Sequence, residues 1–272
     1  MTAVPTPPSR PSRGVTNWPA QASSRGRFAL LHGVTSSRST WWRVGPALAA
    51  AGWDVTAVDL AGHGDGPRLP AENGDLTALV DAVVPRLPAG LTVLVGHSLG
   101  AVVALAVAAR EPAVARGLVL EEPPGMAGGD PSQVADSIEA GALAVRADRK
   151  AFWQYVRLTN PGWDDADVEG SVAAFEQTDT GTITRALRAG LSWDLPALLR
   201  AVVVPVLVVA ARQVEGAAGA SALVGADRRA VRGMLPEARF VELDGGHSLH
   251  REQPDRMVEI ISGFGASLVS SG

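Results

Sequence analysis

The chain has 272 residues, of which 46% are hydrophobic and 19% charged; this suits one large α/β domain, with or without an insertion, and excludes a disordered chain. A net charge of −4 with scattered arginines argues against nucleic acid or an anionic membrane as a partner. Because there is no cysteine, disulfides, thiolate zinc sites and a cysteine nucleophile are excluded.

The N-terminal segment, residues 1–26, is rich in Pro, Ser and Arg and lacks the apolar stretch of a secretory signal. We expect a mobile leader there, with a short edge strand around residues 14–18. No stretch of the chain reaches the roughly 18 consecutive apolar residues of a membrane span. The sequence therefore favours a cytoplasmic protein with no membrane partner.

From residue 27 onward, short β-rich segments alternate with longer helical patterns, which is typical of parallel βαβ units. The run at 91–95 is continuously apolar, which indicates a central strand buried on both faces. We predict an α/β core made of residues 27–124 and 197–272. Its elements are strands at 27–31, 54–59, 91–95, 117–120, 202–210 and 239–243, and helices at 41–51, 76–87, 101–110 and 255–267.

Between residues 125 and 196 the alternation stops, and only helical segments are predicted. This stretch is rich in aromatic side chains: Trp153, Tyr155, Trp163, Phe175 and Trp193. A helical insertion with flat apolar side chains predicts a cap, or lid, over a pocket. The alternative is that the aromatic side chains only attach the insertion to the core.

A candidate nucleophile lies directly after the buried strand, in the sequence Gly96-His97-Ser98-Leu99-Gly100. This is the G-x-S-x-G pattern between a strand and a helix, in which a tight, strained turn presents the serine hydroxyl above the sheet. Side chains at the two glycine positions would clash with the neighbouring helix and strand. Ser98 is thus the predicted nucleophile; the alternative is a glycine-rich turn with a capping serine.

Five histidines could supply the base. A base must lie on a loop after a late strand so that it reaches back to the serine, and His247, which follows Asp244-Gly245-Gly246, meets that condition. His250 is expected to begin the next helical turn, and His97 to point away from the nucleophile. We predict His247 as the base; the alternative is a surface imidazole.

Four motifs occur in the order and spacing of one known family, the α/β-hydrolase superfamily, which residues 27–268 resemble. They are His32-Gly33, the loop from Asp59 to Gly64, the Ser98 pentapeptide, and Gly245-Gly246-His247. The resemblance implies an eight-stranded, mostly parallel sheet with a helical cap inserted after the sixth strand. It also implies an oxyanion hole made by the amide of Leu99 and the amide of Val34, with Gly33 as the alternative to Val34.

The acid departs from the usual family pattern. Most members have an aspartate shortly after the seventh strand, a place that falls near Val214, with Glu215 beside it. Glu121 and Glu122 instead end the strand before the insertion, an arrangement similar to zearalenone-type lactonases and to some haloalkane dehalogenases. By that resemblance Glu122 is the acid, with Glu215 and then Glu121 as alternatives. Since neighbouring strand residues face opposite ways, Glu121 and Glu122 cannot both serve.

A serine nucleophile implies acyl transfer, and we expect hydrolysis of a small-molecule carboxylic ester or lactone without metal or organic cofactor. Epoxide hydrolases and dehalogenases of this fold need an aspartate at the position of Ser98. Two alternatives stay open: a catalytically silent ligand-binding protein and an acyltransferase. The identity of the substrate and the oligomeric state are not encoded in any recognisable pattern.

Overall fold

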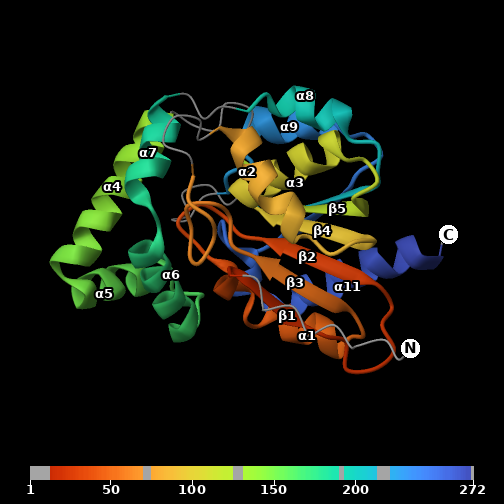
Figure 1. The fold of residues 1–272 in the computed structure, drawn as a ribbon, viewed down its shortest axis with the longest axis horizontal. Coiled ribbons are helices and arrows are strands. Elements are labelled where there is room, and N and C mark those ends of the chain that lie inside the picture. The colour runs from red at the N-terminus through yellow and green to blue at the C-terminus, as the bar shows by residue number, and fades with distance from the viewer. Residues whose placement is uncertain (1–12, 70–74, 125–130, 190–192, 213–220, 271–272) are drawn as a thin grey trace, which may run out of the picture.

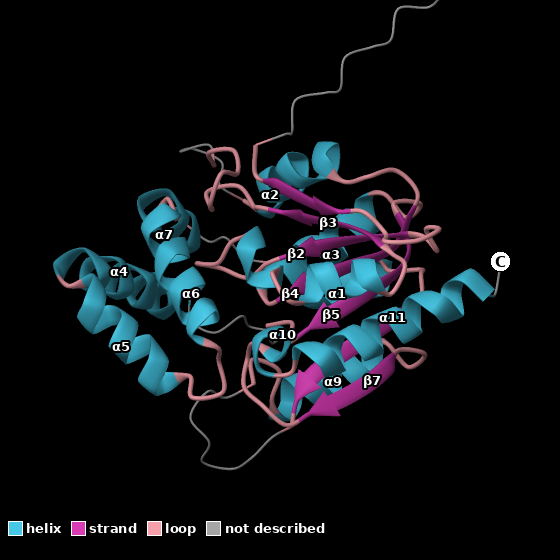
Figure 2. Ribbon diagram, turned by 90° about the horizontal axis from the view of Figure 1, so that it is seen from below, coloured by secondary structure: helices cyan, strands magenta, loops and turns pink. Residues whose placement is uncertain are grey.

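A computed structural model describes residues 13–69, 75–124, 131–189, 193–212 and 221–270. Within these ranges seven strands form one sheet in the order β1-β3-β2-β4-β5-β6-β7 (Figures 1 and 2). Only β1 is antiparallel to its neighbour. The strands are β1 Val15–Trp18, β2 Arg27–Leu31, β3 Asp54–Val58, β4 Leu91–His97, β5 Ala115–Glu121, β6 Val206–Ala211 and β7 Arg239–Leu243. The mostly parallel α/β sheet is confirmed, although the expected eight strands are seven in the described residues.

Helices cover both faces of the sheet, which explains why every residue of the central strand β4 is buried. On one face, α1 Val44–Ala50 and α11 Pro254–Ser270 pack on side chains such as Phe28 and Trp53. On the other face lie α2 Leu76–Val83, α3 Leu99–Arg110, α8 Leu195–Ala201 and α9 Gly225–Met234. Short turns of 3₁₀ helix, η1 Arg38–Trp41 and η2 Val84–Arg86, precede α1 and follow α2.

One strand begins later than its sequence indicates. The apolar run predicted as a strand from residue 202 becomes β6 only at Val206. Residues 202–205 form a short connection after α8, which ends at Ala201. This helix begins after Asp194, whose side chain accepts a hydrogen bond from the Ala197 amide. The prolines at positions 196 and 205 then delimit the helix and the strand.

Four further helices form a separate layer beside the sheet: α4 Pro131–Ala147, α5 Arg149–Thr159, α6 Asp165–Gln177 and α7 Thr180–Arg188 (Figure 1). They have their own apolar cluster, in which Phe152 packs edge-on against Phe175 with ring centroids 5.3 Å apart. Both views show this layer beyond the end of the sheet (Figure 2). In the described residues no helix combines the length and apolarity needed to cross a membrane.

Candidate active site

Ser98 lies at the sharp turn between β4 and α3, with φ 51° and ψ −118°. For a residue other than glycine this backbone conformation is strained. The glycines on either side make the turn possible: a Cβ at Gly96 would lie 2.2 Å from the Gly100 carbonyl oxygen, and one at Gly100 would lie 2.5 Å from that of Leu31. The sequence pattern therefore produces a serine held above the carboxyl end of β4, at the beginning of a helix.

His247 follows β7 and lies next to Glu122, which follows β5. The His247 Nδ1 is 3.3 Å from the Glu122 Oε2. Glu122 is completely buried, and its carboxylate also accepts hydrogen bonds, each 2.7 Å long, from the Ala211 amide, the Ser221 hydroxyl and the Ala222 amide. A carboxylate held by this many donors keeps a fixed position. Donation from Nδ1 to Glu122 leaves Nε2 of His247 free to act as an acceptor.

The other candidate acids differ in their surroundings. Glu121 is also fully buried, but its Oε1 accepts from the His250 amide at 2.9 Å and lies 2.9 Å from His250 Nδ1. Burial raises the pKa of Glu121. The two neighbouring glutamates thus face different histidines, although only Glu121 belongs to β5 and Glu122 follows the strand with a φ of 46°. Glu215 and the neighbouring Val214 lie outside the described residues.

The turn after β2 holds the predicted oxyanion donors. Gly33 and Val34 line the same cavity as Ser98, while Leu99 opens α3 directly after Ser98. His32 holds this turn in place, because its Nδ1 donates to the Gly33 carbonyl at 2.7 Å and its Nε2 accepts from the Leu60 amide at 2.9 Å. The assignment of these amides to an oxyanion hole stays a prediction.

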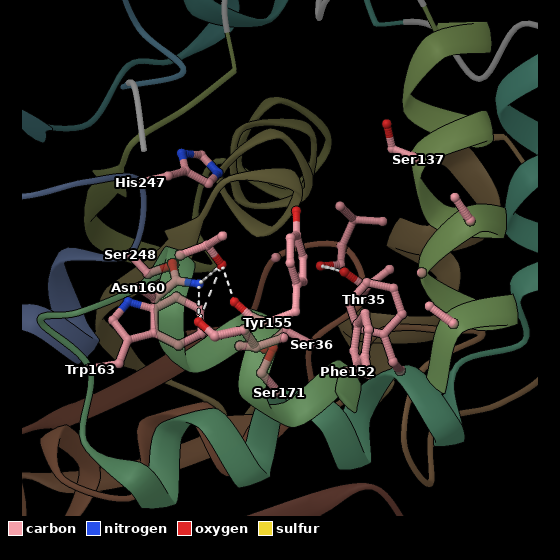
Figure 3. A pocket seen from close by; sticks show the side chains of 18 of the residues that line it. Thr35, Ser36, Ser137, Phe152, Tyr155, Asn160, Trp163, Ser171, His247 and Ser248 are labelled. Atoms are coloured by element: carbon pink, nitrogen blue, oxygen red, sulfur yellow. Dashed lines mark hydrogen bonds between the residues drawn. The ribbon is translucent and has the colours of Figure 1, made fainter. Parts of the chain in front are cut away.

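A cavity of about 900 Å³ separates the sheet from the layer of α4, α5 and α6 (Figure 3). Ser98 and His247 lie on its sheet side. Small side chains of α4 and aromatic side chains line the opposite side. These are Ala140, Gly141, Ala144, Phe152, Tyr155 and Phe175. Ser98, His247, Gly33 and Val34 are thus brought to one mostly apolar pocket, whereas Glu122 and Leu99 do not line it.

Comparison with known proteins places this arrangement in a family. The model of the alpha/beta hydrolase family matches residues 28–260, which is most of the chain. The chain belongs to the alpha/beta hydrolase family.

Individual relatives of this alpha/beta hydrolase are distant or match only in part. A pimeloyl-acyl-carrier protein methyl ester esterase of Neisseria meningitidis is 43% identical over 91 residues, which cover 34% of the chain and 28% of the esterase. This match thus spans less than a third of that esterase. A pyrrolizixenacetamide deacetylase of Xenorhabdus hominickii is 26% identical over 249 residues, covering 87% of the chain and 90% of the deacetylase.

Among solved structures, MenH from S. aureus resembles the hydrolase with a TM-score of 0.74 at 18% identity, over 94% of this chain and 98% of MenH. Identity this low supports the shared fold alone. The superfamily resemblance inferred from the motifs is confirmed by the family model, which matches residues 28–260.

His97 of the hydrolase lies differently from what its place in the motif suggested. The side chain lines the cavity instead of pointing away, and its Nε2 donates to the His247 carbonyl at 2.7 Å. Burial lowers its pKa, and its Nδ1 has no hydrogen-bond partner among the described residues. His97 therefore holds the backbone of the histidine loop, a contact between residues 150 positions apart that no local pattern indicates.

Three buried side chains, those of His97, Glu121 and His250, offer possible metal-ligand atoms within 4.8 Å of one another. Each also has a hydrogen-bond partner within the protein: His97 holds the His247 carbonyl, and Glu121 and His250 contact each other. His250 further contacts Thr40 through Nε2 at 2.6 Å. The group therefore forms a buried hydrogen-bond network below the cavity.

Proposed function

We propose that the protein is a serine hydrolase that cleaves a carboxylic ester or lactone through an acyl-enzyme on Ser98. The main support is that Ser98 and His247 line one cavity while Nδ1 of His247 lies 3.3 Å from the buried Glu122 carboxylate. Nucleophile, base and orienting acid then come from the carboxyl ends of β4, β7 and β5, the edge at which parallel α/β sheets bind ligands.

In this mechanism the Ser98 hydroxyl attacks the substrate carbonyl and passes its proton to Nε2 of His247. Glu122 keeps the second proton of the ring on Nδ1 and stabilises the imidazolium that forms. The oxyanion is held by the Leu99 amide and the Val34 amide, or by Gly33 in place of Val34; each donor contributes roughly 3 kcal/mol. His247 returns its proton to the leaving alcohol, and a water then hydrolyses the acyl-enzyme.

The layer of α4–α7 is proposed to be the cap of this hydrolase, with residues 125–196 as the inserted segment. The cavity below it has mostly apolar walls, which suits the carbon skeleton of an ester better than a highly charged substrate. The names of the relatives, a methyl ester esterase and a deacetylase, are in keeping with acyl transfer to water.

The decisive experiment compares wild type with Ser98→Ala in the hydrolysis of short p-nitrophenyl esters and in labelling by a fluorophosphonate. Ser137→Ala is the matched control, because Ser137 is a serine of α4 that lines the same cavity. We expect hydrolysis and labelling to be lost only in Ser98→Ala. Equal activity of Ser98→Ala and wild type would refute the assignment.

Two outcomes would favour the alternatives. A folded wild type that neither hydrolyses esters nor reacts with the fluorophosphonate indicates a catalytically silent binding protein. An ester product that grows with added alcohol at the expense of free acid indicates an acyltransferase.

A further inference from the structure

One wall of the cavity contains a buried cation. Arg251 belongs to α10 Leu249–Glu252, four positions after His247, and is only 5% exposed. Its guanidinium lies 4.2 Å from the ring centre of Trp163, and both side chains line the cavity. No carboxylate of the described residues lies within 4 Å of the Arg251 guanidinium. A buried charge without a direct partner is unfavourable unless something else neutralises it.

The position of this guanidinium is fixed by hydroxyl groups. Its Nε donates to Thr40 at 2.8 Å, and its Nη2 donates to Ser36 at 3.2 Å. The Nδ1 of His250 faces the Glu121 carboxylate and therefore carries the ring proton. Nε2 of His250 then accepts from the Thr40 hydroxyl, whose oxygen in turn accepts from Arg251. Glu121 is therefore a remote counter-charge, separated from Arg251 by two side chains.

Asp167 and Glu121 attract the charge of Arg251, but neither carboxylate forms an ion pair with the guanidinium. Asp167 accepts from Arg43 and from the indole nitrogen of Trp42, so its carboxylate is already paired. Burial lowers the pKa of Arg251, which reflects the lost hydration of its charge. Both hydrogens on Nη1 of Arg251 have no acceptor among the described residues. The guanidinium is thus held in position by two hydroxyl groups, and it belongs to a residue that lines the cavity.

A second donor lies beside it. The indole Nε1 of Trp163 is buried and has no hydrogen-bond partner in the described part of the chain. A buried N–H that finds no acceptor in the protein is itself unfavourable. Trp163 and Arg251 both line the cavity, so a ligand at this end lies close to the ring and to the guanidinium. Figure 3 shows Trp163 and Ser248 on one side of the pocket, apart from Ser137 of α4.

We propose that Arg251 binds a carboxylate of the substrate, so that the preferred ester or lactone carries a second, anionic group. This proposal rests on the proposed function, since it places the carboxylate in the same cavity as Ser98. The Trp163 ring packs on the guanidinium, and the apolar side, with Ala144 and Phe152, takes the carbon chain. Arginine suits this role because its planar donors match a carboxylate.

The test uses p-nitrophenyl monoesters of linear dicarboxylic acids, each paired with its neutral ω-methyl ester. For the chain length that fits, we expect wild-type kcat/KM to be about 10- to 100-fold higher for the acid than for its methyl ester, as a charge-assisted hydrogen bond provides. Arg251→Met should bring this ratio close to one, and Arg251→Lys should restore part of it. Arg149→Met, at an exposed arginine of α5 paired with Glu169, is the control and should keep the wild-type ratio.

The ratio of kcat/KM for the acid to kcat/KM for its methyl ester, measured on wild type, tests the proposal even if Arg251→Met fails to fold. A ratio of one or less at every chain length, with Ser98-dependent cleavage of the methyl esters, would overturn the proposal and leave the proposed function intact. Trp163→Phe, which replaces the indole with a smaller ring and so weakens the packing on Arg251, should lower the ratio. If Ser98 does not react at all, calorimetry with free adipate decides: binding lost in Arg251→Met supports the site, and no binding to wild type overturns it.

Discussion

The burial of His32 predicts that the folded protein loses stability in mild acid. Its ring is completely buried, and the neutral form satisfies both nitrogens, because Nδ1 donates to Gly33 and Nε2 accepts from Leu60. A second proton would go to Nε2 and face the Leu60 N–H. The Asp59 carboxylate, 3.9 Å away, is already paired with Arg38. Burial therefore lowers the pKa of His32 from 6.5 to about 4.

The size of the effect follows from that shift. Below pH 6.5 the unfolded chain binds a proton at His32 that the folded chain does not, so the free energy of unfolding falls as the pH falls toward 4. The full shift corresponds to about 3 kcal/mol, and about 2.5 kcal/mol of it is lost by about pH 4.5. Well above pH 6.5 neither state binds this proton, so His32 contributes no pH dependence there.

Urea unfolding of wild type and His32→Gln at about pH 7.5 and about pH 4.5 measures this contribution. The glutamine carbonyl can still accept from the Leu60 amide but does not titrate. Burial also lowers the pKa of the neighbouring His63, to about 3, but that group is present in both proteins. We expect wild type to lose about 2.5 kcal/mol more than His32→Gln. Equal losses would show that His32 has no lowered pKa in the folded chain.

Three further predictions concern the site. Glu122→Gln should lower kcat by roughly 10³-fold or more with little change in KM, whereas Glu121→Gln should lower Tm and keep kcat within about tenfold of wild type. Steady-state kinetics and thermal melts distinguish the two variants. A large loss of kcat in Glu121→Gln and not in Glu122→Gln would show that Glu122 is not the acid. Ala144→Trp should fill the apolar side of the cavity, so KM rises for long acyl chains and not for acetate esters, and an unchanged chain-length profile would place the acyl group elsewhere. Gly96→Ala should destabilise the fold by about 1–3 kcal/mol or more, because the added Cβ meets the Gly100 carbonyl at 2.2 Å; a wild-type melting curve would contradict this.

The features that sequence analysis predicts well are those encoded locally. The run before Ser98 is apolar and followed by two glycines at fixed spacing, and both the strand and the turn follow from these few residues. β6 was placed too early, because Val202 and Val204 are as apolar as the strand itself, and the end of α8 depends on capping. Local pattern thus predicts elements well and their ends less well.

Contacts between distant parts of the chain were less predictable. Strand alternation states that Glu121 and Glu122 face opposite sides, but which of them faces His247 depends on the path of the loop after β7. The same loop brings the His247 carbonyl to His97, so the direction of His97 could not be read from its own motif. The buried Arg251 follows from the packing of α6 against η1, far apart in sequence, which sets Trp163 and Thr40 around it.

The walls of the cavity come from two different kinds of sequence segment. Ser98, His247 and Gly33 are contributed by loops dispersed over the core, whereas the apolar wall from Ser137 to Phe175 is one uninterrupted stretch of chain. A recombination event that exchanged only this stretch would deliver a new pocket in a single step and leave the dispersed residues untouched. We therefore expect the substrate of such a protein to diversify by replacement of this whole segment. A laboratory chimera that exchanges the same segment is the simplest way to change its substrate.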